Sequence, residues 1–326
     1  MVIGLRLGFS LGSLLSVDEI LDCAKVLKQY SPDSIWVPET WGMECGTMLA
    51  AVSQIAREPK IGSSIINIYS RTPSLIAMSA ATLDLLSHGR LILGLGTSSK
   101  AIVEEWHGLE FMEPLQRMRE CVEIIRRILA GNKVNYDGKI FKIRNFGLLI
   151  KPLRMSVPIY LAAVNEKMVD LAWEMGDGVI FYLRPRNELQ KTITRMHNRK
   201  RIDVACQIIT CVSDDLEKAL TRAKKTISFY VAVGKTYRDF LSMNGFRKET
   251  EAIFSEYGRS GLGGIHDLVP DSMVESLALC GTPAEIPAKL KRFSEAGIDL
   301  PIIQFNPIGD VAGSFRTLAA SLKGEI

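Results

Sequence analysis

The chain of 326 residues has few of the side chains from which metal sites and disulfide frameworks are built. It has only four histidines, and its six cysteines are scattered, without a C-x-x-C pair. A structural zinc site needs a close set of cysteine and histidine ligands, and a disulfide framework needs densely spaced cysteines. We therefore expect no metal site and no disulfide framework, and we expect reduced thiols in a cytoplasmic protein.

A strong charge of one sign and a long hydrophobic run are also absent. The formal net charge is +4, with the basic residues spread along the chain, whereas a nucleic-acid-binding surface is usually strongly basic. No apolar run reaches the roughly 18 residues of a membrane-spanning helix. The apolar start, MVIGLRLGFSLGSLL, contains Arg6 and no small-residue cleavage site, which indicates a buried strand rather than a signal peptide. These features favour a small-molecule partner over nucleic acid or a membrane.

Short apolar segments alternate with amphipathic segments through most of the chain. Ser16 and Glu19 have the spacing of a capping box, which predicts a helix start, and Pro73 suits the first position of another helix. About eight strands are expected, most of them followed by a helix. They lie at residues 3–9, 34–37, 60–67, 90–96, 158–163, 178–182, 204–212 and 300–305.

This alternation predicts an α/β fold with parallel strands, covered by helices on both sheet faces. Eight such units close naturally into a (β/α)8 TIM barrel. A doubly wound open sheet is the alternative, but the GLG sequence at 94–96 lacks the third glycine of the dinucleotide-binding fingerprint. We predict a single barrel domain over residues 1–326. It would carry a hairpin insertion near 132–145, with a type I′ turn at Asp137-Gly138, and a mainly helical insertion near 225–280.

In a TIM barrel the site lies at the carboxyl ends of the strands. The predicted strand ends carry small, amide and hydroxyl side chains, with no Ser-His pair and no cluster of carboxylates. They include Phe9-Ser10, Glu39-Thr40-Trp41, Ser64-Ile65-Ile66-Asn67, Gly96-Thr97, Val164-Asn165 and Gln304. Such a lining favours a large, flat ligand that itself carries the reactive chemistry.

Four segments carry a family resemblance. They are GSSIINIYSRTPSLIAMSAATLDLLSHGRLILGLGTSSKA at 62–101, YDGKIFKI at 136–143, PIYLAAVNEKMVDLAWEMGDGVI at 158–180, and the C-terminal segment at 268–310. They resemble the bacterial-luciferase-like superfamily, and more narrowly its branch that uses coenzyme F420, a deazaflavin. Within that branch the chain is similar to the methylenetetrahydromethanopterin reductases. The resemblance implies a luciferase-like TIM barrel that transfers a hydride between C5 of the deazaflavin and a substrate carbon.

The resemblance also implies cofactor-binding roles at three strand ends. In the F420 branch the third strand ends in a bulge with a non-prolyl cis peptide bond behind the deazaflavin ring, and the matching bond here is Ser64–Ile65. An ordinary strand end, with Asn67 capping a turn, is the alternative. Gly96-Thr97 would let the backbone approach the cofactor, or would form a simple glycine turn. The backbone amides at Val164-Asn165 would hold the cofactor phosphate at a helix start, with plain N-capping by Asn165 as the alternative.

Two strand ends depart from the reductase pattern, and they bear on catalysis and substrate. The reductase has aspartate and histidine where this chain has Glu39 and Thr40, and glutamate in place of Ser10. Glu39 would adjust the protonation of the reduced cofactor, or form a structural ion pair. Trp41 would stack on the substrate or ring, or anchor the core. Phe9, Ser10 and Thr40 are the expected substrate contacts, and a tetrahydropterin is the substrate that the resemblance implies.

Other possibilities stay open from the sequence. An FMN-dependent monooxygenase uses the same barrel, although the NIYSRTP segment at 67–73 favours the deazaflavin. A non-catalytic flavin- or deazaflavin-binding protein is a further alternative, because the strand ends offer few catalytic side chains. Arg184 and Arg186 would meet the acidic tail of the cofactor or remain exposed and solvated. A homodimer or homotetramer is expected, with spare apolar faces on helices such as 117–130.

Overall fold

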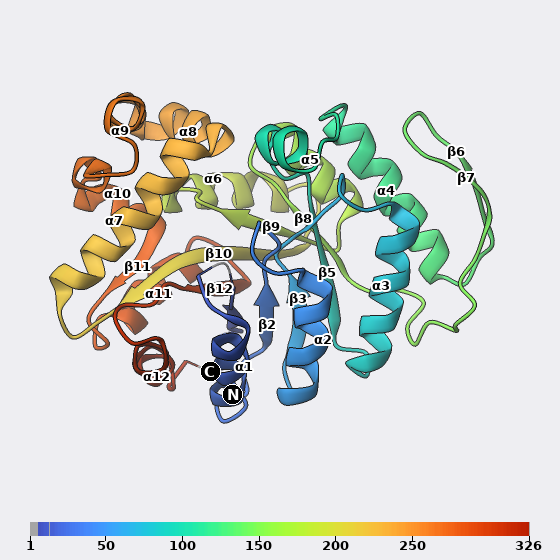
Figure 1. Cartoon of the computed structure of the whole chain (residues 1–326), viewed down its shortest axis with the longest axis horizontal. Coiled ribbons are helices and arrows are strands. Elements are labelled where there is room, and N and C mark those ends of the chain that lie inside the picture. The colour runs from blue at the N-terminus through green and yellow to red at the C-terminus, as the bar shows by residue number, and fades with distance from the viewer. Residues whose placement is uncertain (1–5, 13, 326) are drawn as a thin grey trace.

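A closed barrel of eight parallel strands forms the centre of the computed structural model, which describes residues 6–12 and 14–325 (Figure 1). The strands are β1 (Gly8–Ser10), β2 (Ser34–Val37), β3 (Lys60–Ser63), β5 (Leu91–Gly96), β8 (Ile159–Ala162), β9 (Gly178–Tyr182), β10 (Asp203–Val212) and β12 (Leu300–Phe305). Each strand pairs with the next in this order, and β12 pairs with β1 to close the ring. The predicted TIM barrel is confirmed, and the open-sheet alternative is wrong.

Helices surround the barrel, most of them between consecutive strands (Figure 1). They include α1 (Val17–Leu27), α2 (Cys45–Ile55), α3 (Pro73–Leu86), α4 (Pro114–Leu129), α5 (Glu166–Met175), α6 (Arg186–His197), α7 (Leu216–Val233), α11 (Ile286–Ser294) and α12 (Val311–Ser321). The capping box at Ser16 and Glu19 is confirmed, and Pro73 begins α3. Within the described ranges, none of the helices combines the length and apolar composition that a membrane crossing requires.

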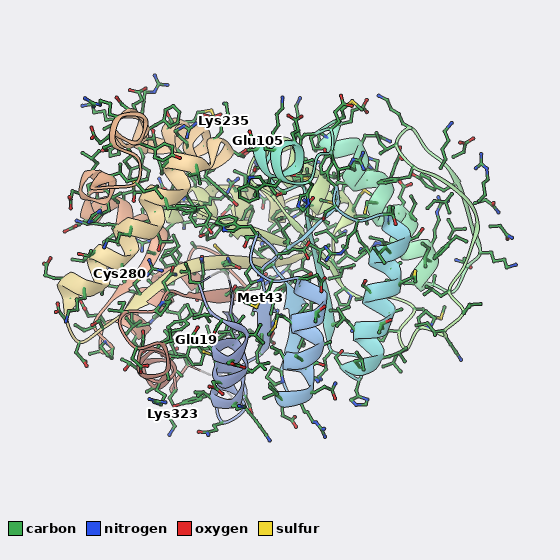
Figure 2. The ribbon with its side chains drawn as sticks, in the orientation of Figure 1. Glu19, Met43, Glu105, Lys235, Cys280 and Lys323 are labelled. Carbon is green, nitrogen blue, oxygen red and sulfur yellow. The ribbon has the colours of Figure 1, made fainter. Side chains whose placement is uncertain are left out.

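The region after α7 departs from the regular repeat. It contains α8 (Lys235–Leu241), α9 (Arg247–Ser260), α10 (Asp271–Leu277) and the strand β11 (Ala278–Gly281). β11 pairs with the end of β10 beside the barrel, and its residue Cys280 is marked in Figure 2. The sequence predicts a mainly helical segment here and does not predict β11. In Figure 1, α8 and α9 lie toward the top of the view, the direction in which the arrow of β2 points.

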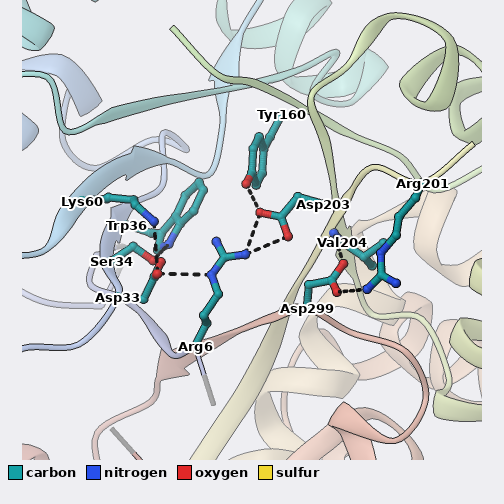
Figure 3. Close-up of polar contacts among 10 residues, drawn as sticks. All are labelled: Arg6, Asp33, Ser34, Trp36, Lys60, Tyr160, Arg201, Asp203, Val204 and Asp299. Carbon is teal, nitrogen blue, oxygen red and sulfur yellow. Dashed lines mark hydrogen bonds and ion pairs between the residues drawn. The ribbon is translucent and has the colours of Figure 1, made fainter. Parts of the chain in front are cut away.

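An ion-pair network lies at the amino ends of the strands (Figure 3). Arg6 Nη1 bonds both carboxylate oxygens of Asp203 at 3.0 Å, and Arg6 Nε bonds Asp33 Oδ1 at 3.2 Å. Asp203 also accepts a hydrogen bond from the Tyr160 hydroxyl. Burial alone would lower the pKa of Arg6, but the two carboxylates raise it above its usual value. This end of a TIM barrel serves stability rather than catalysis.

The first strand is shorter than predicted. β1 covers Gly8–Ser10, and residues 6 and 7 precede it without strand structure. The remainder of the predicted strand, residues 3–5, lies outside the described residues. Arg6 does not continue the strand, and its side chain joins the network of Figure 3.

Apolar side chains fill the barrel next to this network. Trp36 is fully buried there together with Ile92, Tyr160, Ile180, Ala205, Leu300 and Ile302. Its indole donates a hydrogen bond to Ser34 Oγ at 2.8 Å. A Cβ on Gly62 would lie 2.4 Å from the Trp36 ring, so glycine is needed where the ring crosses the barrel. These described side chains fill the amino end of the barrel, so we expect a ligand to approach the interior from the carboxyl ends of the strands.

The predicted hairpin is present, but its predicted turn is wrong. β6 (Val134–Asp137) pairs with β7 (Lys142–Phe146) in antiparallel fashion, and Asp137 lies opposite Lys142. Residues 138–141 therefore form the connection, and neither Asp137 nor Gly138 has the positive φ that a type I′ turn requires. The carboxylate of Glu120 on α4 organises this loop. It accepts hydrogen bonds from the backbone N–H groups of residues 139, 140 and 141 at 2.8–3.0 Å.

Replacing Glu120 with glutamine should destabilise the protein by about 2 kcal/mol, because a charged acceptor of several N–H groups is lost. Burial alone would raise the pKa of Glu120, but the hydrogen bonds from Gln116 and the loop lower it below its usual value. Its contribution to stability is therefore complete above the unfolded-state pKa of about 4.3 and is lost as pH falls through the lower folded-state pKa. Urea unfolding of both proteins at pH 7 and at about pH 3 measures this difference, which should shrink in acid. The same change at exposed Glu105 (Figure 2) should have no effect.

Candidate active site

The third barrel strand is interrupted by a bulge. β3 ends at Ser63, β4 (Ile66–Asn67) follows, and the peptide bond between Ser64 and Ile65 is cis, at the position expected from the family resemblance. Gly62 pairs with Ile92 before the bulge, and Ile66 pairs with Leu95 after it. Residues 63–65 thus stand opposite residues 93 and 94, which is one extra residue on the bulged side.

Ser63 and Gly94 hold the bulge against β5. The buried Ser63 hydroxyl donates to the carbonyl of Gly94 at 2.9 Å and accepts from its N–H at 2.8 Å. It therefore replaces the backbone hydrogen bonds that the bulge interrupts. A Cβ on Gly94 would lie 1.9 Å from Ser63 O, and a Cβ on Gly96 would lie 2.4 Å from the Ile65 side chain. Both glycines are needed for this close approach, and a direct contact of Gly96 with a cofactor stays a prediction.

Several buried polar atoms near the carboxyl ends of the strands have no hydrogen-bond partner among the described residues. They include Ser64 Oγ, Asn67 Nδ2, Gln207 Oε1 and Gln304 Oε1. Asn67 does cap the turn, since its Oδ1 accepts from the N–H of Tyr69 at 2.9 Å, but its amide NH₂ remains available. Buried polar atoms normally have partners, so these groups fit a polar ligand that lies against the bulge and the interior-facing glutamines.

Glu39 forms the ion pair that the sequence left as its alternative role. Its carboxylate binds Arg71 and accepts a hydrogen bond from the N–H of Cys45 at 3.3 Å. Arg71 also bonds Glu44 at 2.5 Å. Burial alone would lower the pKa of Arg71, but Glu39 and Glu44 raise it. Arg71 was missed as a candidate because its partners lie about thirty residues earlier in the chain. The half-buried Thr40 follows Glu39 directly.

Trp41 lies in an exposed aromatic group with Trp106 and Phe229. Trp41 is 58% exposed and Trp106 54%, so the core-anchor alternative for Trp41 is wrong. The ring centroids of Trp41 and Trp106 are 5.2 Å apart at 80°, and those of Trp41 and Phe229 are 6.1 Å apart. Trp106 ends a π-helical turn (Ile102–Trp106) after β5, and Phe229 belongs to α7. Three separate connections therefore place aromatic rings together, and only Trp41 was predicted.

The turn after β8 is held by a buried arginine. Asn165 is the N-cap of α5, with its Oδ1 accepting from the N–H of Met168 at 3.0 Å. Arg184 Nη2 donates to the carbonyl of Val164 at 2.5 Å, and Nη1 donates to Thr192 Oγ1 at 2.8 Å. The free N–H groups at the start of α5 and this cation offer two favourable elements for an anion.

Arg184 is 3% exposed, so the prediction of a solvated base is wrong for this residue. Its guanidinium lies over the rings of Phe181 and Phe240 at 4.9 and 4.4 Å, and its Nε has no partner among the described residues. Burial lowers the pKa of Arg184 to about 10, so it stays charged at neutral pH. Arg186 is half-buried and lies over Phe293.

Of the remaining predicted site residues, one lies in the hydrophobic core and two lie at strand ends that can face a ligand. Phe9 is fully buried and contacts Phe315 of α12 edge to face at 6.3 Å. The structure therefore corrects its assignment, because Phe9 belongs to the core between β1 and α12. Ser10, the next residue of β1, faces the opposite side, toward the barrel interior. Thr97 directly follows β5 and is half-buried, with its hydroxyl 3.4 Å from the carbonyl of Ser98.

Comparison with known proteins identifies relatives along nearly the whole chain. The profile of the family described as Luciferase-like monooxygenase matches residues 5–300. A 5,10-methylenetetrahydromethanopterin reductase of Archaeoglobus fulgidus is 31% identical over 289 residues, covering 85% of this chain and 86% of that protein. One of the same name from Methanolobus tindarius is 27% identical, with 89% and 91% covered.

Solved structures show the same fold. The coenzyme F420 dependent tetrahydromethanopterin reductase from Methanopyrus kandleri matches with a TM-score of 0.86 at 23% identity, covering 98% of both chains. An F420-dependent secondary alcohol dehydrogenase, in complex with an F420-acetone adduct, matches with a TM-score of 0.79 at 20% identity, covering 99% and 98%. At these sequence identities the structural matches show that the fold is shared, and they show nothing further about function.

Proposed function

Because the chain belongs to the luciferase-like monooxygenase family, and is thus an oxidoreductase, we propose that it uses coenzyme F420 to transfer a hydride to or from a substrate carbon. The relatives named as reductases and the F420-dependent enzymes of the same fold support this choice. FMN is the alternative cofactor. When bound, the deazaflavin supplies the reactive C5, and the protein supplies position and surroundings.

The observation that carries the proposal is the bulge after β3. It presents Ser64 Oγ and Asn67 Nδ2 as buried polar atoms without partners in the described part of the chain. Ser63, Gly94 and Gly96 hold it in place. We propose that a deazaflavin ring rests against the bulge, and that its phosphate binds at the start of α5 near Arg184. A rigid support of this kind favours hydride transfer by fixing the distance and orientation of the reacting atoms.

Other side chains would shape the space around the ring. The ion pair of Glu39 with Arg71 joins the connection after β2 to the connection after β4, so we assign Glu39 a positioning role. Trp41 and Trp106 would cover a planar substrate and exclude water from it. A methylenetetrahydropterin-type reduction is the specific reaction we propose. It is supported by the names of the relatives and by the exposed aromatic group.

Oxidation of reduced F420 tests this function. The purified protein is mixed with reduced F420 and methylenetetrahydromethanopterin, and the absorbance of the oxidised deazaflavin is followed at about 420 nm. We expect turnover that requires both the protein and the pterin. Oxygen-dependent turnover with reduced FMN, without any turnover of F420, would contradict the proposal and indicate a monooxygenase.

We also propose that the chain forms a homodimer through α3. The apolar residues of α4 are buried, so the spare face expected on 117–130 is absent. Instead Leu75, Met78 and Leu85 are partly exposed along one side of α3. Met78→Glu should shift the protein toward monomer in light scattering. Met243→Glu, the same change at an exposed residue after α8, should leave the mass unchanged, and equal masses for all three proteins would contradict an α3 interface.

A further inference from the structure

A basic pocket lies between α7 and the loop after β12, apart from the residues assigned above. Its volume is about 330 Å³, and its walls include Lys218, Arg222 and Lys225 of α7 and the loop at 307–309. We propose that this pocket binds a carboxylate or phosphate group carried by the substrate. The assignment to the substrate rests on the function proposed above, whereas the affinity for an anion does not.

The charges of the pocket favour an anion. One carboxylate, Glu217, stands among three cationic side chains, which leaves a formal charge of +2 on the walls. Lys218 is paired with Asp215 at 3.3 Å. In the described part of the chain, Arg222 and Lys225 have no ion-pair partner, and the buried Nε of Arg222 has no hydrogen-bond partner. Buried donors of a cation normally have an acceptor, so the guanidinium of Arg222 fits an anionic group bound in this pocket.

The position of the pocket along α7 connects it to the aromatic group. Arg222, Lys225 and Phe229 are spaced three and four residues apart, which places them on one face of the helix. Seven residues of helix span about 10 Å, and Phe229 contacts Trp41. Between Lys225 and Phe229 on the helix, Thr226 donates a hydrogen bond to Asn306 Oδ1 at 3.1 Å, which fixes this part of α7 to the end of β12.

This geometry fits an elongated substrate rather than the cofactor. Its planar part would lie against Trp41 and Phe229, and its anionic end would reach Arg222 and Lys225. The residues proposed to hold the cofactor phosphate follow β8 and β9. The pocket instead lies beside the segments that follow β10 and β12. The substrate class is therefore a flat ring system with a carboxylate or phosphate about 10 Å away, as the helix spacing implies.

Calorimetric titration with inorganic phosphate, and separately with glutarate, tests the site at constant ionic strength and without cofactor. The double variant Arg222→Gln/Lys225→Gln should bind one or both anions at least about tenfold more weakly than the unchanged protein, since two charge-assisted contacts are removed. The matched control is Lys224→Gln/Lys235→Gln. It removes two cations that already have ion-pair partners. Lys224 on α7 is paired with Asp271, and Lys235 on α8 (marked in Figure 2) is paired with Asp239. Its anion affinity should not change.

Parallel F420 titrations separate the sources of the anion. We expect the same F420 affinity in both double variants, together with a raised KM for methylenetetrahydromethanopterin in Arg222→Gln/Lys225→Gln only. A fall in F420 affinity in that variant would overturn the substrate assignment and place the acidic tail of the cofactor in the pocket. If the two double variants and the unchanged protein bound phosphate with the same affinity, and likewise glutarate, the site itself would be overturned. Anion binding by a protein that binds no F420 would leave the site intact and remove the proposed function. Lys225→Glu, a single change at an exposed position, provides the same test if the double variant folds poorly.

Discussion

Replacing Gly94 with alanine should weaken F420 binding by about 100-fold, which corresponds to about 2.7 kcal/mol. The new methyl group would lie 1.9 Å from the carbonyl oxygen of Ser63, and a backbone atom cannot move aside as a flexible side chain can. The bulge and β5 must therefore separate, which disturbs both hydrogen bonds between Ser63 and Gly94. We expect a loss of stability of about 3 kcal/mol from this overpacking. Fluorescence titration with F420 and urea unfolding measure the two effects.

Gly258→Ala is the matched control for this substitution. Gly258 lies within α9, and a Cβ there would meet no atom within 4 Å. Alanine in a helix is more favourable than glycine, so the free energy of unfolding of this variant should rise by about 0.5–1 kcal/mol. Its affinity for F420 should not change. A folded Gly94→Ala protein with the F420 affinity of the unchanged chain would show that the bulge does not support the ring.

Replacing Arg184 with methionine should weaken F420 binding by about 30-fold, because a charge-assisted contact near the proposed phosphate site is lost. The side chain also holds the carbonyl of Val164 before α5, so the turn itself would loosen. A purely structural role would affect every ligand of the barrel. We therefore compare F420 with the same deazaflavin lacking its phosphate, and we expect only the phosphate-bearing form to lose affinity.

Two further variants sharpen this comparison. Arg184→Lys keeps the charge but not the paired donors to Val164 and Thr192, so its F420 affinity should fall between those of the unchanged protein and the methionine variant. Arg126→Met removes an arginine that binds the carbonyl of Met175 at the other end of α5, and should not change F420 affinity. An equal loss of affinity for both deazaflavins in Arg184→Met would place Arg184 in the scaffold rather than at the phosphate.

The barrel could be predicted from the sequence because its causes are local. Apolar strands alternate with capped amphipathic helices, and this periodicity indicates parallel pairing without knowledge of distant contacts. The capping box at Ser16 and Glu19 depends on residues three apart, and the structure contains it. The position of the bulge came instead from the family resemblance, since neither propensity nor periodicity distinguishes Ser64-Ile65 from a continuous strand.

The features that escaped prediction depend on partners distant in sequence. The hairpin loop is shaped by Glu120, which precedes it by about twenty residues and competes successfully with the local preference of Asp-Gly for a tight turn. Arg184 is buried because Phe181, Phe240 and Thr192 gather around it from separate elements. The aromatic group of Trp41, Trp106 and Phe229 likewise forms only when three connections meet at one end of the barrel.

The use of F420 by this barrel is tested most directly by a parallel titration of the purified protein with F420 and with FMN. Absorbance and fluorescence are followed at about 420 nm for the deazaflavin and about 450 nm for FMN. We expect saturable, tight binding of F420, at least about 100-fold tighter than that of FMN, a difference of about 2.7 kcal/mol. Preferential binding of FMN would contradict this expectation and assign the barrel to flavin-dependent oxygen chemistry.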